Sequence, residues 1–322
     1  MTPTTSFTLG DDDRDRAPLT VRRMGLGAMR LPGGNVFDER AAAPVDRSQP
    51  IAVLRRAVEL GVNHIDTAAF YISPTRSANE LINSALAPYP DDLLIAAKVG
   101  LGLDPDGKSY GARPDQLRLQ VEENLRQLGR DHLDLVYLRR LRQDSIAEHF
   151  GALAELREAG MIRHLGLSNA RLPHLAEAQR IAPVAAVENR FNLEIRLHED
   201  VLRACTEQNI AFVPYFAIAG EGREAGYAAR EAVRALDAAV EQVAKRHEAT
   251  PAQIRLAWTL HQGPNVLAIP GTNSLAHLEE NIAAGELELS DEDLEQLDSI
   301  HWAEQVTAAG GASVPEVSDT RK

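Results

Sequence analysis

The sequence predicts an α/β protein that folds as a single (β/α)8 TIM barrel. Short, continuous apolar segments alternate with amphipathic helical segments along most of the 322 residues. Continuous apolar strands are typical of a parallel sheet whose faces are covered by helices. Eight strand–helix units can be recognised, and right-handed crossovers between parallel strands favour closing eight such units into one barrel.

An open, doubly wound sheet is the alternative architecture for the same alternation. Such sheets usually carry a Gly-x-Gly-x-x-Gly turn after the first strand, where a dinucleotide binds. The first predicted strand, 23–28, is not followed by such a turn. The barrel is therefore favoured over about residues 22–300, and we expect residues 1–322 to form one domain around it.

The predicted strands are short apolar runs, and each is followed by a segment with apolar residues at helical spacing. The strands cover 23–28, 62–66, 93–99, 133–138, 162–167, 184–188, 211–215 and 266–269. The helices after them cover 51–60, 77–86, about 114–128, 145–159, 173–180, 199–209, 229–247 and 275–284. Two further helices are expected to start at Pro251 and after Ser290.

Several helix ends carry local signals that justify these boundaries. Pro114 suits a first helical turn, where its missing N–H costs nothing. Gly160 terminates the helix before it, since glycine readily adopts the left-handed conformation of a C-cap. Thr250 is an expected N-cap, and Ser290 with Asp293 has the spacing of a capping box.

The two ends of the chain lie outside the barrel in this prediction. Residues 7–9 and 19–21 are expected to form an N-terminal hairpin that closes the barrel bottom. The acidic run 11–16 between them is interpreted as its solvated turn. The tail from Thr307 is small and polar, so we expect it to be short and mobile.

Charge and composition exclude several classes of partner. The formal net charge of −13 disfavours nucleic acid and anionic membrane surfaces. No apolar run approaches the roughly 18 residues that would span a membrane, and no signal-peptide layout is present. The single cysteine, Cys205, is interpreted as a buried structural thiol. We expect a cytoplasmic monomer or small homo-oligomer without a metal site.

Four polar residues at or just beyond strand ends form the most informative pattern. Asp66 ends the second strand and Tyr71 follows it, Lys98 lies at the end of the third, and Arg139 follows the fourth. In a (β/α)8 barrel the carboxyl ends of the strands meet at one mouth, where active sites lie. Any one of these residues has a structural explanation, but four at matching ends indicate a site.

This combination of side chains suits proton donation to a carbonyl group. A free tyrosine has a pKa of about 10, and an ammonium group beside the phenol is expected to lower it. A carboxylate paired with the lysine keeps the ammonium charged and fixed. Tyr71 is then the general acid, Lys98 its tuner and Asp66 the anchor, while a hydride reaches the carbonyl carbon.

The same segments resemble the aldo-keto reductases over residues 23–300. The resemblance is carried by 25–29, by Gly61-Val62-Asn63-His64-Ile65-Asp66-Thr67-Ala68 with Tyr71, by 166–169, and by 269–272 continuing to 280–281. It implies an Asp-Tyr-Lys-His tetrad in which Arg139 replaces the histidine. Within the family the chain is most similar to a bacterial branch that includes NADPH-dependent pyridoxal reductases.

The resemblance also implies a nicotinamide cofactor held without a Rossmann fold. NADPH is expected, with NADH as the alternative, because this chain is less cationic than many relatives near the 2′-phosphate. Ser168 and Asn169 are expected to bind the carboxamide, Glu188 stands in the place of a glutamine that does so too, and Tyr215 stacks on the ring. The remaining implied contacts are Gly27 and Ala28 in the opening strand, Gly271, Thr272, Asn273 and His277 at the 2′-phosphate, and Glu280 and Asn281 at the adenine.

Arg139 leaves three interpretations open. Its guanidinium is a fixed cation that donates hydrogen bonds without shuttling protons. It can stabilise the developing oxyanion, which we favour, bind an acidic group of the substrate, or point away and pair with Asp134 or Asp144. The neighbouring Arg140 and Arg142 are interpreted as solvated loop residues rather than as anchors for an anionic substrate.

Three functions follow from these observations. The leading prediction is an NADPH-dependent reductase of a small-molecule carbonyl substrate, with pyridoxal or a similar aromatic aldehyde as the specific guess. The unusual loop 217–229 motivates a second, a reductase of a keto-sugar or polyketide intermediate. The arginine at the histidine position motivates a third, a barrel that binds nicotinamide nucleotide as a sensor or scaffold with little turnover.

Overall fold

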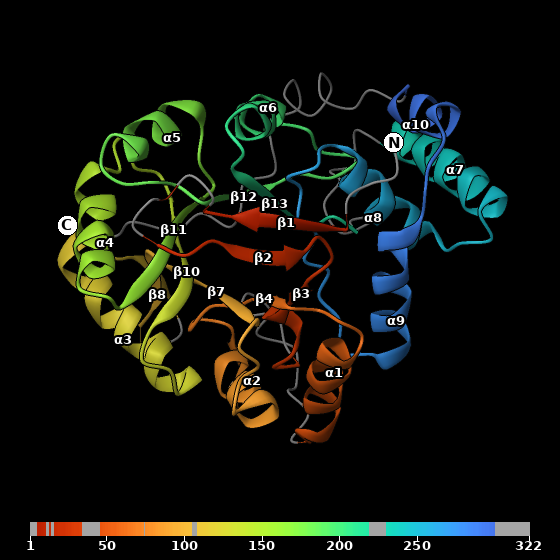
Figure 1. Cartoon of the computed structure of the whole chain (residues 1–322). Helices are drawn as coiled ribbons and strands as arrows, with labels where there is room; N and C mark the ends of the chain where they lie inside the picture. The colour runs from red at the N-terminus through yellow and green to blue at the C-terminus, as the bar shows by residue number, and fades with distance from the viewer. Residues whose placement is uncertain are drawn as a thin grey trace.

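The computed structural model describes residues 5–10, 13, 16–33, 46–73, 75–104, 108–218 and 230–299. For residues 230–235 it describes the backbone only. A curved parallel sheet lies inside a ring of helices (Figure 1). Its strand order is β13-β12-β11-β10-β7-β4-β3. The strands are β3 Leu26–Gly27, β4 His64–Asp66, β7 Leu94–Val99, β10 Leu133–Arg139, β11 Ile162–Ser168, β12 Ala186–Arg190 and β13 Ala211–Tyr215.

The eighth predicted strand, 266–269, closes the barrel without forming a continuous strand. Val266 bridges Phe212 of β13, and Ala268 bridges Met24 just before β3. Pro270 has no N–H with which to extend this ladder. The buried Arg23 guanidinium reinforces this seam by donating to the Val266 carbonyl at 3.0 Å. The (β/α)8 barrel class is therefore confirmed, with one strand reduced to bridges.

The predicted helices all occur, with ends displaced by a few residues. They are α1 Ser48–Glu59, α2 Ala78–Leu86, α3 Leu117–Leu128, α4 Ala147–Glu158, α5 Leu172–Gln179, α6 Glu199–Glu207, α7 Arg230–Arg246, α8 Pro251–His261, α9 Leu275–Ala283 and α10 Asp291–Asp298. The N-cap at Thr250 and the capping box at Ser290 are confirmed, since each hydroxyl accepts from the backbone N–H three residues later. Cys205 is fully buried in α6, as predicted, and burial raises its pKa to about 12.

The N-terminal hairpin covers one end of the barrel, as the sequence predicts. Strands β1 Ser6–Leu9 and β2 Leu19–Arg22 pair antiparallel and cross the end that faces the viewer in Figure 1. The interpretation of 11–16 as a solvated turn is wrong for Asp13, whose buried carboxylate accepts from Arg157 Nη2 at 2.6 Å. A buried charge needs such a partner, and this one fastens the turn to α4. Residues 11, 12, 14 and 15 lie outside the described residues.

Two small hairpins after β4 and β7 were not predicted. They are β5 Ile72–Ser73 with β6 Arg76–Ser77, and β8 Leu101–Leu103 with β9 Ser109–Gly111. Strands of two or three residues are too short to show a period of two. Gly102 leaves space in the second hairpin for the Tyr110 ring, which would lie 2.4 Å from a Cβ at this position.

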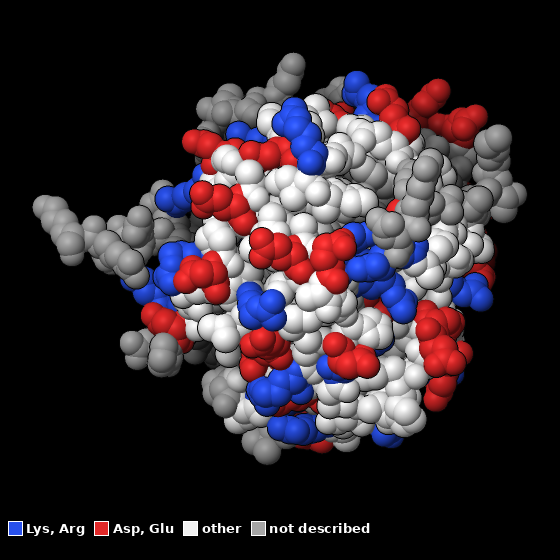
Figure 2. Space-filling view, turned by 60° about the vertical axis from the view of Figure 1, so that its left-hand side comes forward, with Lys and Arg blue, Asp and Glu red and all other residues white. Residues whose placement is uncertain are grey.

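Charges of both signs are interspersed on the surface that Figure 2 shows, without one extended field of a single sign. Among the described residues, no helix is both long enough and apolar enough to cross a membrane. The C-terminal tail from 307 and the segment 219–229 lie outside the described residues.

Candidate active site

The strand ends bring five predicted residues into one buried group, which we call the Lys98 cluster: Asp66, Tyr71, Lys98, Arg139 and Glu188. The Lys98 ammonium is fully buried and forms an ion pair with the Asp66 carboxylate. Its Nζ also lies 3.3 Å from Oε2 of Glu188, which is buried on β12. One ammonium therefore serves two carboxylates. The pair with Asp66 was predicted, whereas the contact with Glu188 was not.

Tyr71 lies against this ammonium at the barrel mouth. Lys98 Nζ is 5.3 Å from the centroid of the Tyr71 ring, and the residue is 7% exposed. The segment that carries it is fixed by a buried chain of hydrogen bonds, in which Thr67 Oγ1 donates to Asn79 Oδ1 at 2.7 Å. The Tyr71 backbone N–H also donates to the Ala68 carbonyl. The phenol is thus held by the loop after β4 and by helix α2.

Burial controls the pKa of the Tyr71 phenol more than the lysine does. Burial raises the pKa of Tyr71 to about 12; Lys98 and Arg139 lower it, and Asp66 and Glu188 raise it. The predicted lowering by Lys98 is present, but burial outweighs it because a buried phenolate loses its hydration. Burial lowers the pKa of Lys98. The carboxylates of Asp66 and Glu188 together raise it by more, so the pKa lies above its ordinary value. Tyr71 is a protonated donor and Lys98 a permanent cation near neutral pH.

Glu188, which stands in the place of a carboxamide-binding glutamine, also contacts Lys98. Burial raises its pKa to about 7; Lys98 lowers that pKa, Asp66 raises it and Arg139 lowers it. Burial likewise raises the pKa of Asp66, against the opposing effects of Lys98 and Arg139. The Glu188 carboxylate contacts the Lys98 ammonium. Glu188 therefore belongs to the Lys98 cluster as well as to the expected carboxamide site.

A second phenol, Tyr137, lies beside Lys98 on the neighbouring strand β10. It was not predicted to belong to the site. Its ring centroid is 5.7 Å from Lys98 Nζ, and the residue is 2% exposed. Gly166 makes room for it, since a Cβ there would lie 2.7 Å from the Tyr137 ring. The sequence contained the signal, because Tyr137 is two residues before Arg139 on β10 and therefore faces the same side.

Arg139 ends β10 and is half buried. Its guanidinium makes no hydrogen bond or ion pair with any residue in the described part of the chain, and its Nε is buried. The interpretation that it pairs with Asp134 or Asp144 is wrong, because Asp134 is instead held by Arg130 at 2.9 Å. The positive charge of Arg139 lowers the pKa values of Tyr71, Asp66 and Glu188.

Arg140 does not match its interpretation as a solvated loop residue. Its Nε donates to the Gln143 carbonyl at 2.9 Å, and its Nη1 donates to the Asn169 carbonyl at 3.4 Å. It is half buried and fixes the loops after β10 and β11 to each other. Arg140 therefore supports the site from its edge.

The residues expected at the nicotinamide carboxamide do come together. Ser168 is fully buried, and its Oγ has no hydrogen-bond partner among the described residues. Asn169 has a left-handed backbone, with φ of 60°, and its Oδ1 accepts from the Tyr215 hydroxyl at 2.7 Å. An orphaned buried hydroxyl beside a fixed amide suits a ligand with both donors and acceptors. A nicotinamide carboxamide fits this description.

The residues expected to contact the cofactor from the opening strand lie close to those expected at its 2′-phosphate. A Cβ on Gly27 would be 2.6 Å from the Ile269 carbonyl oxygen, and one on Gly271 would be 2.9 Å from the Gly27 carbonyl oxygen. These glycines let β3, which Ala28 follows, approach the chain after the barrel seam. Asn273 Oδ1 is buried without a partner among the described residues, so this region too has an unused polar atom.

The N-terminus of α9 completes this region. The Thr272 hydroxyl accepts from the Ser274 N–H at 3.1 Å, and the Ser274 hydroxyl caps α9 by accepting from the His277 N–H. His277 is exposed on the first turn, where backbone N–H groups favour anions. Along the same helix, Glu280 is half buried and Asn281 is buried. The binding roles of these residues remain predictions.

A family model now connects this geometry to known proteins. The model described as the aldo/keto reductase family matches residues 23–301. The chain belongs to the aldo/keto reductase family. As a member it is an NAD(P)H-dependent oxidoreductase, and the resemblance drawn from the sequence is confirmed.

Individual members of the family match over almost the whole chain. Pyridoxine 4-dehydrogenase of Escherichia coli (strain K12) is 40% identical over 303 residues, which are 92% of this chain and 98% of that protein. The thermostable aldo-keto reductase Tm1743, solved with the inhibitor epalrestat, is 28% identical, with a TM-score of 0.74 and coverage of 92% of this chain and 100% of that chain. An aldo/keto reductase from Klebsiella pneumoniae, solved with NADP and acetate, is 25% identical, with a TM-score of 0.74 and coverage of 93% and 96%.

Proposed function

We propose that this aldo/keto reductase uses NADPH to reduce a small aldehyde or ketone, with pyridoxal or a similar aromatic aldehyde as its substrate. The observation that carries the proposal is the buried contact between Tyr71 and the Lys98–Asp66 ion pair at the barrel mouth. A protonated phenol beside a permanent cation is suited to donate a proton to a carbonyl oxygen. When bound, the cofactor supplies the hydride to the carbonyl carbon.

Tyr71 is the general acid in this proposal. Its raised pKa keeps it protonated in neutral solution, and negative charge that develops on the carbonyl oxygen draws the proton from the phenol. Lys98 then stabilises the phenolate, and Asp66 holds the ammonium in position. General acid catalysis of this kind typically contributes about 10²–10⁴ in rate.

Arg139 is the oxyanion donor in the place of the family's histidine. Its guanidinium is half buried and has no hydrogen-bond or ion-pair partner among the described residues, so its N–H groups can donate to a substrate oxygen. A preorganised donor at a developing oxyanion is worth about 2.7–4 kcal/mol in other enzymes. This supports oxyanion stabilisation over a purely structural role for Arg139.

The residues that would hold NADPH are those with unused polar atoms or close backbone approaches. Ser168 and Asn169 would bind the carboxamide, and Tyr215 would stack on the ring. Gly27 and Gly271 would allow the backbone to approach the phosphates. The N-terminus of α9 would take the 2′-phosphate, and the Klebsiella relative that was solved with NADP supports the phosphorylated cofactor.

The substrate assignment rests on the relative named pyridoxine 4-dehydrogenase, 40% identical to this chain. Pyridoxine and pyridoxal differ by the oxidation of one alcohol to an aldehyde, so one site can handle both. The keto-sugar or polyketide alternative was motivated by the loop 217–229, and residues 219–229 lie outside the described residues. Nothing in the described site favours that alternative.

A substrate panel tests the proposal. NADPH oxidation is measured at 340 nm with pyridoxal, benzaldehyde, a keto-sugar and a linear β-diketide, and each assay is repeated with NADH. We expect turnover with pyridoxal and a preference for NADPH. Turnover confined to the keto-sugar or diketide would refute the substrate, and tight NADPH binding without oxidation of any carbonyl would refute the enzyme in favour of a sensor.

A further inference from the structure

Glu188 gives Lys98 a second counter-ion. The Glu188 carboxylate lies 3.3 Å from the ammonium, and the side-chain atoms of the two residues are 3% and 0% exposed. Asp66 already forms an ion pair with the same nitrogen. A second buried carboxylate carries a large desolvation cost, so its presence beside an already paired lysine calls for an explanation.

Arg139 is placed to compensate for this extra negative charge. In the sheet, Arg139 pairs in register with Ser168, and Ser168 pairs in register with Glu188. The three residues therefore form one row across β10, β11 and β12 at the mouth. Ser168 between them is small, and the Arg139 guanidinium has no ion pair with a described residue. The formal charges of Asp66, Glu188, Lys98 and Arg139 sum to zero.

We propose that Glu188 is a positioning residue that holds Lys98 together with Asp66, and that Arg139 makes its ionised form tolerable inside the barrel. This inference rests on the proposed function, since Lys98 matters to the reaction only if Tyr71 is the acid. The Asp66 carboxylate holds the ammonium from β4, and the Glu188 carboxylate holds it from β12. Together they fix the position of the ammonium relative to the Tyr71 ring. Arg139 thus acts on the charge of Glu188 without contacting it, in addition to its proposed role at the substrate oxygen.

The ionisation of Glu188 makes this role dependent on pH. Burial raises the pKa of Glu188 to about 7, while Lys98 and Arg139 lower it and Asp66 raises it. The phenols Tyr71 and Tyr137 complete the titratable groups that face Lys98 in the described structure. Above this pKa the carboxylate holds the ammonium. Below it the neutral acid does so only weakly, and glutamine becomes a close substitute.

The kinetic test compares wild type with Glu188→Gln at about pH 6 and about pH 8. We expect the substitution to lower kcat/KM by about tenfold at pH 8 and to have much less effect at pH 6, where burial favours the neutral form of wild-type Glu188. A merely structural role would lower activity equally at both pH values. Full activity of Glu188→Gln at pH 8, or an equal loss at both pH values, would overturn the positioning role.

A stability test separates this inference from the proposed function, because it needs no substrate. Arg139→Gln is made in the wild-type and in the Glu188→Gln background, and urea unfolding is followed at both pH values. We expect Arg139→Gln to destabilise the protein at pH 8 more when Glu188 is present than when a glutamine replaces it, and this difference to disappear at pH 6. Equal effects in both backgrounds at pH 8 would overturn the compensation.

Arg190 provides a matched control for that cycle. It lies two residues after Glu188 on β12, and its guanidinium is 6.0 Å from the Phe216 ring centroid. Arg190→Gln removes the same charge from the same mouth, and we expect its effect on stability to be alike in both backgrounds. A coupling to Glu188 as large as that of Arg139 would mean a general charge effect and would also overturn the assignment. If wild type turns over no carbonyl, the proposed function fails while this cycle still decides the inference.

Discussion

At the scale of single residues, the site is governed by burial. A cation beside a phenol is expected to lower the pKa of the phenol, and Lys98 does act in that direction on Tyr71. The cost of burying a phenolate is larger, so the pKa rises to about 12. The result is a proton donor that stays protonated near neutral pH and gives up its proton only when a negative charge forms next to it.

Substitution of Arg139 tests its role as an oxyanion donor. We expect Arg139→Ala to lower kcat by about 10²–10³, in line with the loss of one oxyanion donor, with a much smaller change in affinity for NADPH. Steady-state kinetics gives the first quantity, and quenching of tryptophan fluorescence by NADPH gives the second. The matched control is Arg190→Ala, another arginine at the mouth. An unchanged kcat in Arg139→Ala would eliminate the catalytic role.

The residues of the site could be predicted from the sequence only where position along a strand is sufficient. Asp66, Lys98 and Arg139 could be placed at the mouth because each lies at the end of an apolar run. The contact between Lys98 and Glu188 could not, since it crosses from β7 to β12 through the barrel interior. Such contacts depend on the stagger of the strands, which no local pattern contains.

At the scale of elements, helices were predicted better than strands. Their starts are marked by capping residues such as Thr250 and Ser290, whose hydrogen bonds form within four residues. The hairpins at the mouth were missed because their strands are two or three residues long. The seam at 266–269 was taken for a full strand because its apolar run looks like the others, although only isolated bridges form there.

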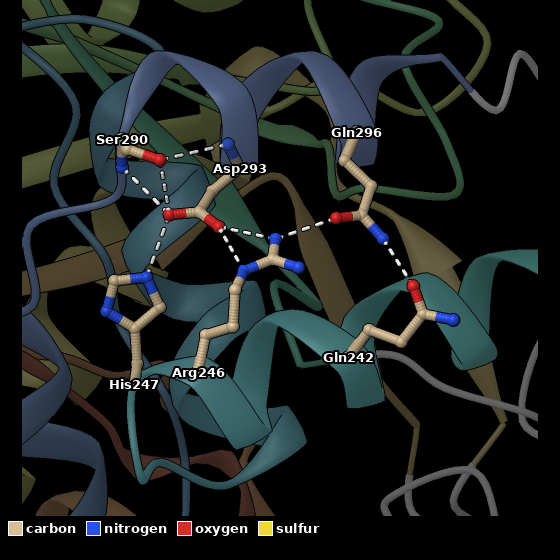
Figure 3. Close-up of polar contacts among 6 residues, drawn as sticks. All are labelled: Gln242, Arg246, His247, Ser290, Asp293 and Gln296. Atoms are coloured by element: carbon tan, nitrogen blue, oxygen red, sulfur yellow. Dashed lines mark hydrogen bonds and ion pairs between the residues drawn. The ribbon is translucent and has the colours of Figure 1, made fainter.

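The contact between α7 and α10 shows how one carboxylate joins two elements (Figure 3). Asp293 lies in the first turn of α10, where its carboxylate accepts from the Ser290 N–H at 3.0 Å. It also accepts from Arg246 Nη2 at 2.6 Å and lies 2.8 Å from His247 Nε2. Burial raises the pKa of Asp293. The hydrogen bonds from His247, Arg246 and Ser290 together lower it by more, so the pKa lies well below its ordinary value. The folded protein therefore favours the charged form.

Replacing Asp293 tests this contact. Because the pKa is lowered by folding, the stabilisation is fully present above the unfolded pKa of about 3.9 and is lost as the pH falls through it toward the folded value. We expect Asp293→Asn to reduce the free energy of unfolding by about 1.5–3 kcal/mol at neutral pH, and by less at about pH 3. Urea unfolding measures both. Asp291→Asn, an exposed change in the same turn, is the control; an equal loss there would contradict the assignment.

At the scale of the whole molecule, the barrel is closed by polar contacts that composition does not show. The buried Arg23 guanidinium fastens the seam through the Val266 carbonyl, and the buried Asp13–Arg157 ion pair fastens the N-terminal hairpin to α4. The barrel class followed from the alternation of strands and helices. These fastenings did not, since each joins residues more than 140 positions apart.

The central claim is that the barrel mouth transfers a hydride to a carbonyl carbon while Tyr71 supplies the proton. The most direct measurement is a single turnover with NADPH deuterated at the transferred C4 position, followed by mass spectrometry of the alcohol, for wild type and for Tyr71→Phe. We predict one deuterium at the carbonyl carbon with wild type, and a rate lower by about 10²–10⁴ in Tyr71→Phe with NADPH binding retained. An alcohol without deuterium, or a Tyr71→Phe rate equal to that of wild type, would contradict the claim.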